Sequence, residues 1–188
     1  MWSDRMRWFC PPAEAREADG VLRVVTGEKG DFWRDTFYGF RHDDGHALLA
    51  PGGDEFSAEV TFRGEWQAQY DQAGLYVRAS ESHWIKAGVE FVNGQLHLAT
   101  VVTNGASDWS QMPLPGVKGE IGLRLTRAGD AVWVQYRLAE DWAMFRLAPF
   151  PKGMSAEVGP MACSPSRAGL VVEFRDFRLG APVSRQPY

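Results

Sequence analysis

The sequence predicts an all-β fold in which two antiparallel sheets pack face to face as a sandwich or jelly roll. Apolar and polar residues alternate with a period of two along most of the 188 residues, and no long segment has the 3.6-residue period of a helix. Glycine-containing turn sequences such as PGGD, VNGQ and TNG separate the alternating segments. Many short strands joined by turns are typical of β-sandwiches.

The expected strands follow one another along the chain with short connections. They cover residues 20–27, 56–64, two runs within 71–91, and residues 95–103, 120–129, 131–139 and 167–180. In the segment 56–64, every second residue from Phe56 to Phe62 is apolar, so that face is expected to lie in the core. The segment PPAEAREA, at 11–18, suits a single helical turn. We expect one domain over residues 1–180 and a C-terminal tail at 181–188.

The composition favours a soluble globular protein, with 45% hydrophobic and 23% charged residues. A net charge of −4 provides no electrostatic basis for binding nucleic acid or anionic membranes. No apolar run approaches the ~20 residues that a membrane span requires, and the first residues lack the apolar core of a signal peptide. We therefore expect a cytoplasmic protein with neither nucleic acid nor a membrane as partner. The oligomeric state stays open.

No metal or cofactor site is expected. The two cysteines, Cys10 and Cys163, are too few for a disulfide framework, and whether they ever pair stays open. The cluster HDDGH at 42–46 does not match zinc or EF-hand spacing. No phosphate-binding glycine loop and no nucleophile-elbow motif is present.

The central stretch DQAGLYVRASESHWIKAGVEF, residues 71–91, predicts a hairpin with an unusual outer face. Its core-facing positions are apolar, whereas the alternate positions carry glycine, aromatic and charged residues. The Asn93–Gly94 turn that follows is a strong hairpin signal. The two turns predict cross-strand rows Gln72–Glu90–His97, Gly74–Gly88–Ala99, Tyr76–Lys86–Val101 and Arg78–Trp84–Thr103.

The row of small residues predicts a depression with polar and aromatic walls, which we interpret as the floor of a ligand-binding pocket. Two further segments, DFW at 31–33 and SDWS at 107–110, pair an acid with tryptophan in expected loops. Sugars present C–H faces to aromatic rings and hydroxyls to polar groups, so this mixture fits a carbohydrate site. The candidate ligand-binding residues are Gln72, Tyr76, Trp84, Lys86, Glu90, His97, Trp33, Asp71, Asp108 and Trp109. The alternative is an ordinary solvated face in which the glycines mark bulges.

Long segments of the chain resemble one known family. TGEKGDFWRDTFYGFRHDDGHALL, YDQAGLYVRASESHWIKAGVEF, VVTNGASDWS and VGPMACSPSRAGLVVEFRDF are similar to the domain-of-unknown-function 1349 family, over about residues 21–179. That family includes bacterial proteins and a fungal relative named for regulation of enolase, and it resembles concanavalin A-like lectins and glucanases in fold. The resemblance implies a concanavalin A-like jelly roll. Its motif positions here are Asp31, Phe32, Trp33, Asp71, Gln72, Gly74, Tyr76, Trp84, Lys86, Gly88, Glu90, Ser107, Asp108 and Trp109.

Three functions remain open at this point. The first is a module that binds a carbohydrate or another small polar ligand. The second is a glycosidase-like enzyme with Glu90 as acid/base, which would require a second carboxyl group within catalytic reach. The third is a protein-interaction or regulatory domain, as the fungal relative implies, which would require a large exposed apolar patch.

Overall fold

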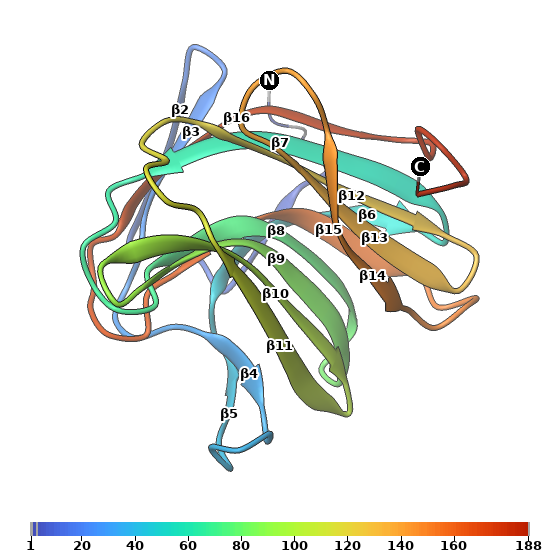
Figure 1. Ribbon diagram of the computed structural model, residues 1–188, viewed down its shortest axis with the longest axis horizontal. Coiled ribbons are helices and arrows are strands. Elements are labelled where there is room, and N and C mark those ends of the chain that lie inside the picture. The colour runs from blue at the N-terminus through green and yellow to red at the C-terminus, as the bar shows by residue number, and fades with distance from the viewer. Residues whose placement is uncertain (1, 3, 188) are drawn as a thin grey trace.

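The computed structural model describes residue 2 and residues 4–187 and confirms the all-β fold. Two seven-stranded antiparallel sheets pack face to face as a sandwich, and a small hairpin projects from one of them (Figure 1). Among the described residues, no helix has the length and apolar character needed to cross a membrane.

The front sheet is the one that carries the central hairpin. Its strands lie in the order β1 (Arg7–Phe9), β6 (His46–Gly53), β15 (Ala156–Cys163), β8 (Gln72–Ser80), β9 (His83–Val92), β10 (Gln95–Asn104) and β11 (Ala106–Pro113). The last four are consecutive in the chain and form a meander, as Figure 1 shows. We call the side of this sheet that points away from the other sheet the front face.

The back sheet closes the sandwich. Its strands lie in the order β14 (Ala143–Pro149), β13 (Ala131–Arg137), β12 (Ile121–Ala128), β7 (Phe56–Gly64), β16 (Val171–Gly180), β3 (Val21–Val25) and β2 (Glu14–Ala18). The projecting hairpin consists of β4 (Phe32–Arg34) and β5 (Arg41–Asp43), which pair only with each other.

The predicted register of the central strands is confirmed. Gln72 pairs with Glu90, and Gly74 pairs with Gly88. Glu90 pairs in turn with His97 across the Asn93–Gly94 turn. The face expected to be apolar fills the space between the sheets. Ala73, Leu75, Val77, Ile85, Ala87, Val89 and Leu98 are all buried there.

A second, smaller apolar cluster lies on the front face, beneath the β4–β5 hairpin. Its buried members are Phe32, Trp33, Ala47, Leu49, Tyr76, Trp84, Val101, Met161 and Cys163. The hairpin thus acts as a lid that covers part of the outer face of the front sheet. Strands beneath it are buried on both sides.

The segment expected to form a helical turn is a strand instead. β2 pairs with β3 through a turn in which Asp19 and Gly20 have φ values of 51° and 78°. Positive φ at both central residues is the geometry of a two-residue hairpin turn, for which Asp-Gly is a preferred sequence. An isolated helical turn is costly to nucleate, whereas the hairpin gives the backbone of these exposed residues cross-strand hydrogen bonds.

The segment SDWS, expected to be a loop, lies on strand β11, which is the edge of the front sheet next to β10. Edge strands carry polar residues because one side faces solvent, and this composition resembles that of a loop. Residues 181–187 have no regular secondary structure. They contact the sheet through the Val183 N–H, which donates to Ser57 Oγ, and through an ion pair of Arg185 with Glu55.

Candidate functional site

A pocket of about 250 Å³ opens on the front face between the central strands and the β4–β5 hairpin. Its lining combines a polar floor with aromatic walls. The lining residues are Asp31, Trp33, Tyr38, Phe40, Tyr70, Gln72, Lys86, Glu90, Val101, Trp109 and Pro165. Five of these, Trp33, Gln72, Lys86, Glu90 and Trp109, are among the residues predicted from the sequence.

The floor is built around the buried side chain of Lys86. Its ammonium lies 2.7 Å from Oε1 of Gln72, 2.9 Å from Oδ1 of Asp31 and 3.9 Å from Oε1 of Glu90. Lys86 and Glu90 are four residues apart on β9, with Gly88 between them on the same face. Because Gly88 and its neighbour Gly74 carry no side chains, the Lys86 side chain crosses their row to reach Gln72.

The predicted depression over Gly74, Gly88 and Ala99 is therefore wrong. The space bounded by Gly88, Ala99 and Met161 has no room even for a water molecule. A Cβ atom on Gly74 would lie 2.0 Å from the carbonyl oxygen of Ala87, so the glycines are required by the close approach of β8 and β9. The ligand space lies above the polar side chains that cover this row.

Glu90 is the polar group of the floor that has fewest partners. Its side chain is 7% exposed, and no protein group among the described residues forms a hydrogen bond of normal geometry with it. Burial raises the pKa of Glu90 to about 7, an effect that the Lys86 ammonium opposes and that Asp31 reinforces. The indole N–H of Trp109 lies near this carboxyl and lowers its pKa, yet Nε1 is buried without a hydrogen-bond partner of normal geometry.

Lys86 keeps its charge despite complete burial. Burial alone would lower the pKa of Lys86, but Asp31 and Glu90 raise it above its ordinary value. The Oδ1 atom of Asp31 also accepts hydrogen bonds from the Phe32 N–H and from the side-chain amide of Gln72. The contact between Asp31 and Lys86 therefore joins the base of the hairpin to the sheet.

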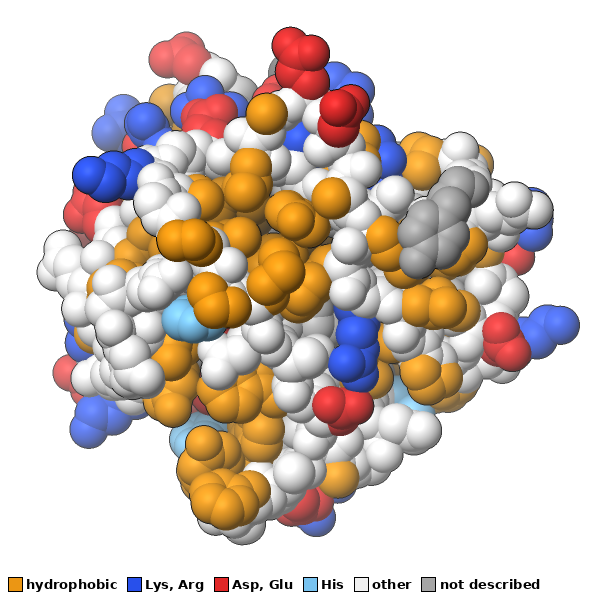
Figure 2. Space-filling model, in the orientation of Figure 1, with side chains coloured by type: hydrophobic (Ala, Val, Ile, Leu, Met, Phe, Trp, Pro, Cys, Tyr) orange, Lys and Arg blue, Asp and Glu red, His pale blue; other side chains and the backbone are white. Residues whose placement is uncertain are grey.

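Aromatic rings from two directions form the walls. Tyr38 and Phe40 on the connection between β4 and β5 stack with their ring centroids 5.2 Å apart, and Tyr38 meets Trp33 edge to face. On the opposite side, Trp109 of β11 contacts Tyr70 edge to face at 6.3 Å. Figure 2 shows hydrophobic side chains gathered at the tip of the hairpin, which carries the exposed rings.

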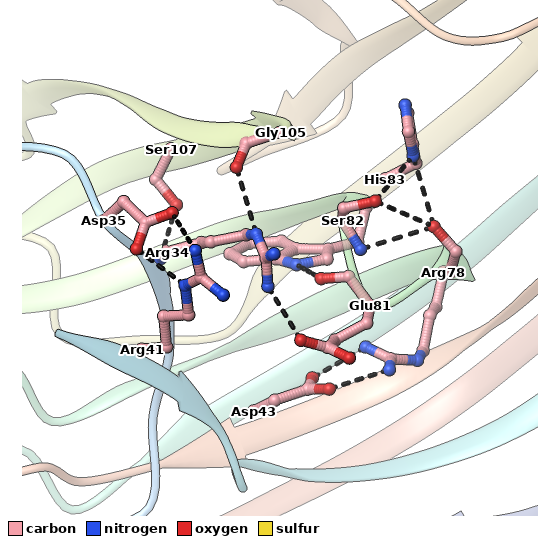
Figure 3. Close-up of polar contacts among 12 residues, drawn as sticks. Arg34, Asp35, Arg41, Asp43, Arg78, Glu81, Ser82, His83, Gly105 and Ser107 are labelled. Carbon is pink, nitrogen blue, oxygen red and sulfur yellow. Dashed lines mark hydrogen bonds and ion pairs between the residues drawn. The ribbon is translucent and has the colours of Figure 1, made fainter.

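The hairpin is fixed to the front sheet by polar contacts at both of its strands (Figure 3). On β4, Arg34 donates from its backbone N–H to Ser107 Oγ and from its guanidinium to the Gly105 carbonyl and to Glu81. On β5, Asp43 accepts two hydrogen bonds from Arg78. These contacts hold the aromatic wall at a set position over the floor.

Two predicted residues, Tyr76 and Trp84, lie beneath the hairpin instead of lining the pocket. Phe32 stacks on Tyr76 with the ring centroids 4.2 Å apart, and both side chains are fully buried. Trp84 donates from its indole to the Glu81 carbonyl. The predicted register placed their strand positions, but the hairpin that covers them could not be placed from sequence.

Three other predicted residues also lie outside the pocket lining. Asp71 is fully buried and is bound by Ser164 and Arg167, and its pKa is lowered because these hydrogen bonds outweigh the effect of burial. Asp108 forms an exposed ion pair with Arg146. His97, although cross-strand from Glu90, lies beside Pro113 of β11.

The lining includes residues that were absent from the predicted set. Asp31 was grouped with Trp33 as a family motif but not as a pocket residue, and Tyr38, Phe40, Tyr70 and Pro165 were not singled out. The run FYGF at 37–40, with three aromatics in a turn, was the available signal. Among the described residues, no group of three or more His, Cys, Asp or Glu side chains could hold a metal ion.

Comparison with known proteins places the chain in a family. The family model described as "Protein of unknown function (DUF1349)" matches residues 8–182. The chain belongs to the DUF1349 family. It is 41% identical over 179 residues to "Regulation of enolase protein 1" of Saccharomyces cerevisiae, a match that covers 95% of this chain and 90% of the yeast protein.

Solved structures agree with this assignment. A functionally unknown protein from Saccharomyces cerevisiae has a TM-score of 0.92 and 41% identity, with 96% of this DUF1349 chain and 98% of the yeast chain covered. The GH43 protein BlXynB from Bacillus licheniformis has a TM-score of 0.63 and 18% identity, over 86% of this chain and 33% of the other. The CBM2 module of Lactobacillus casei BL23 phage J-1 evolved Dit has a TM-score of 0.64 and 11% identity. That match covers 99% of this chain and 94% of the module. The latter two likenesses show the fold alone.

Proposed function

We propose that this DUF1349 protein binds a small carbohydrate in the front-face pocket. The observation that carries the proposal is the combination of aromatic walls with unsatisfied polar groups in one cavity of sugar-ring size. In this proposal the Glu90 carboxylate accepts hydrogen bonds from the ligand, and the indole of Trp109 lies beside it. A sugar hydroxyl can donate to this carboxylate and accept from another donor at the same time.

The walls supply the apolar part of the recognition. Stacking of Tyr38 or Phe40 on a sugar ring buries its C–H face and leaves its hydroxyls directed at the floor. The fold is compatible with this role, since structural neighbours include a protein described as a xylan beta-1,4-xylosidase, with a TM-score of 0.60 and 12% identity. The yeast relative is named for regulation of enolase, and a regulator that binds a sugar is compatible with that name.

A second candidate function, glycoside hydrolysis, rests on the presence of two acids in the pocket floor. Asp31 and Glu90 both approach the Lys86 ammonium, at 2.9 Å and 3.9 Å. Their nearest oxygens are thus closer together than the largest carboxyl separation in inverting glycosidases, about 9.5 Å. The buried Lys86 occupies the space between the two acids, however, and neutralises one of them. This arrangement favours binding over hydrolysis.

The proposal is tested by titrating the protein with a panel of neutral monosaccharides and oligosaccharides while its thermal unfolding is recorded. Binding to the folded state alone raises the melting temperature as the sugar concentration rises. We expect the Tyr38→Ala variant to lose this response, because the ring lines the pocket and is half exposed, so its removal leaves the core intact.

Phe37→Ala provides the matched control, since Phe37 is 93% exposed beside Tyr38 but does not line the pocket. Equal sugar responses in wild type and both variants would place binding elsewhere, and no response to any sugar would contradict the proposal. Release of reducing sugar from the bound oligosaccharide, abolished in Glu90→Gln, would instead establish the hydrolase.

A further inference from the structure

The charges of the pocket floor do not cancel. Lys86 directs its N–H donors at Asp31 and Gln72, at 2.9 Å and 2.7 Å, and lies 3.9 Å from Glu90. The positive charge of Lys86 is thus paired more closely with the Asp31 carboxylate than with the Glu90 carboxylate. The Lys86 ammonium is already engaged by Asp31 and Gln72, so it is not free to hold an anionic sugar. When Glu90 is ionised, the floor carries one excess negative charge with no hydrogen bond of normal geometry from the described protein groups.

The aromatic walls add further negative electrostatic potential to that of the floor. Five aromatic rings line the cavity above Glu90, and they belong to Trp33, Tyr38, Phe40, Tyr70 and Trp109. The face of an aromatic ring carries negative electrostatic potential, which attracts a cation that lies over it. Aromatic rings above a carboxylate constitute the arrangement by which proteins recognise ammonium groups.

We infer that the pocket recognises a ligand through a positively charged ammonium group, held among the aromatic rings above the Glu90 carboxylate. The sugars it takes are then amino sugars, and uronic acids are excluded by charge repulsion. The sugar part of this inference rests on the proposed function, whereas the ammonium part rests on the charge and rings of the cavity. The cation lies on the side of Glu90 away from Lys86.

The titratable and charged groups near Glu90 come from several elements. Lys86 lies on the same strand, His97 lies across from it on β10, and the surrounding groups are Asp31, Tyr38 and Cys163. With a pKa of about 7, Glu90 is neutral in acid and ionised above neutrality. Affinity for a permanently charged ammonium therefore rises between pH 6 and pH 8, and the bound cation in turn favours the ionised carboxylate.

The direct experiment compares ligands that differ in charge and share a shape. Choline carries a permanent quaternary ammonium, and 3,3-dimethyl-1-butanol replaces its nitrogen by carbon. At pH 8 we expect choline to bind the wild-type protein about tenfold more tightly than 3,3-dimethyl-1-butanol does. Isothermal titration calorimetry measures both affinities. Glucosamine is compared with glucose at pH 7, where its amine is largely protonated, and is expected to bind more tightly. Glucuronate is expected not to bind.

Variants separate the charge from the rings. Glu90→Gln keeps the shape of the side chain, so the preference for choline over its neutral isostere should fall to a few-fold at most and lose its pH dependence. Phe40→Leu keeps an apolar surface without a ring at a half-exposed position, so it should weaken choline binding and leave binding of the isostere nearly unchanged. Phe37→Leu, outside the lining, should match the wild type. Circular dichroism spectra verify that each variant is folded.

The outcomes distinguish the two proposals. Choline and its isostere binding equally, with glucose and glucosamine also equal, overturns the ammonium inference and leaves carbohydrate binding standing. Choline binding that depends on Glu90, with no sugar bound, supports the ammonium site and overturns both the amino-sugar assignment and the proposed function. Absence of binding by every probe overturns both.

Discussion

At the scale of single residues, Lys86 has the largest influence on the pocket, because it is a fully buried cation that contacts three polar side chains. Gln72 and Asp31 bind it directly, and Glu90 lies slightly farther away. A buried ion pair contributes little net stability compared with an apolar replacement of both partners, yet removing one partner leaves an uncompensated charge. Lys86 is therefore as much a structural residue as a functional one.

Replacement of Lys86 tests this balance. Lys86→Met removes the ammonium and leaves Asp31 and Glu90 close to each other without a cation, so we expect a loss of about 3 kcal/mol of unfolding free energy at pH 8. Urea denaturation of wild type and variant measures this loss of unfolding free energy. Arg175→Met, which breaks the partly exposed pair with Glu120, should cost at most about 1 kcal/mol. Equal effects of the two substitutions would show that Lys86 is not a critical charge.

The sequence allowed part of this site to be predicted at residue level. Gln72, Lys86 and Glu90 follow from strand alternation together with two hairpin turns, because those rules fix which residues are neighbours on one face. The contact with Asp31 joins residues 55 positions apart in the chain. No local pattern specifies such a contact, so Asp31 could not be assigned to the pocket.

At the scale of elements, β8 and β9 approach each other more closely at Gly74 and Gly88 than side chains allow. A Cβ atom on Gly88 would lie 2.0 Å from the carbonyl oxygen of Ala73. Because Gly74 and Gly88 have no side chains, the Lys86 side chain can cross above them. The two glycines therefore serve the strand pairing and the polar floor together.

Gly88→Ala is expected to destabilise the protein by about 3 kcal/mol, the upper end of the cost of overpacking, because the methyl group meets backbone that cannot move without breaking the ladder. Differential scanning calorimetry of wild type and variant provides the measurement. Gly119→Ala serves as the comparison, since no atom lies within 4 Å of the added Cβ and the substitution should be nearly neutral. A Gly88→Ala protein as stable as wild type would show that the strands can separate at low cost.

Strands whose sequences alternate in residue type were predictable from the sequence, whereas β6 and β15, whose sequences do not alternate, were not. β7 alternates apolar and polar residues and was expected at its observed bounds. β6 is buried continuously from His46 to Ala50, and β15 is buried at nearly every position. The β4–β5 hairpin covers this part of the front face, so the period of two disappears from those sequences.

At the scale of the whole molecule, the raised pKa of Glu90 links stability to pH. The ordinary pKa of the carboxyl group is 4.5, and in the folded protein it is about 7. The folded state therefore binds this proton more tightly than the unfolded state. The contribution of Glu90 to stability is greatest below pH 4.5, falls as the pH rises to 7, and is constant above that.

We predict that the unfolding free energy of Glu90→Gln increases relative to that of wild type as the pH rises from 5 to 7.5. The increase is roughly 3 kcal/mol over the whole titration of Glu90. Unfolding free energies from urea titrations at several pH values give the difference curve. Asp71 has a lowered pKa and acts oppositely, but its contribution is lost only in more acidic solution, outside this range. Parallel curves for the two proteins would mean that Glu90 titrates normally.

The pocket has a floor on the front sheet and part of its wall on the β4–β5 connection, and this division has a consequence for how its selectivity can change. The floor lies on strands held in register by both the sandwich core and the glycine row, so most substitutions there endanger folding. Much of the wall comes from residues 35–40, which form neither sheet and expose Phe37, Tyr38 and Phe40 to solvent. Substitutions of the exposed rings of Tyr38 and Phe40 therefore change the wall without disturbing the core of the sandwich, so the ligand preference of the pocket can shift while the scaffold is kept.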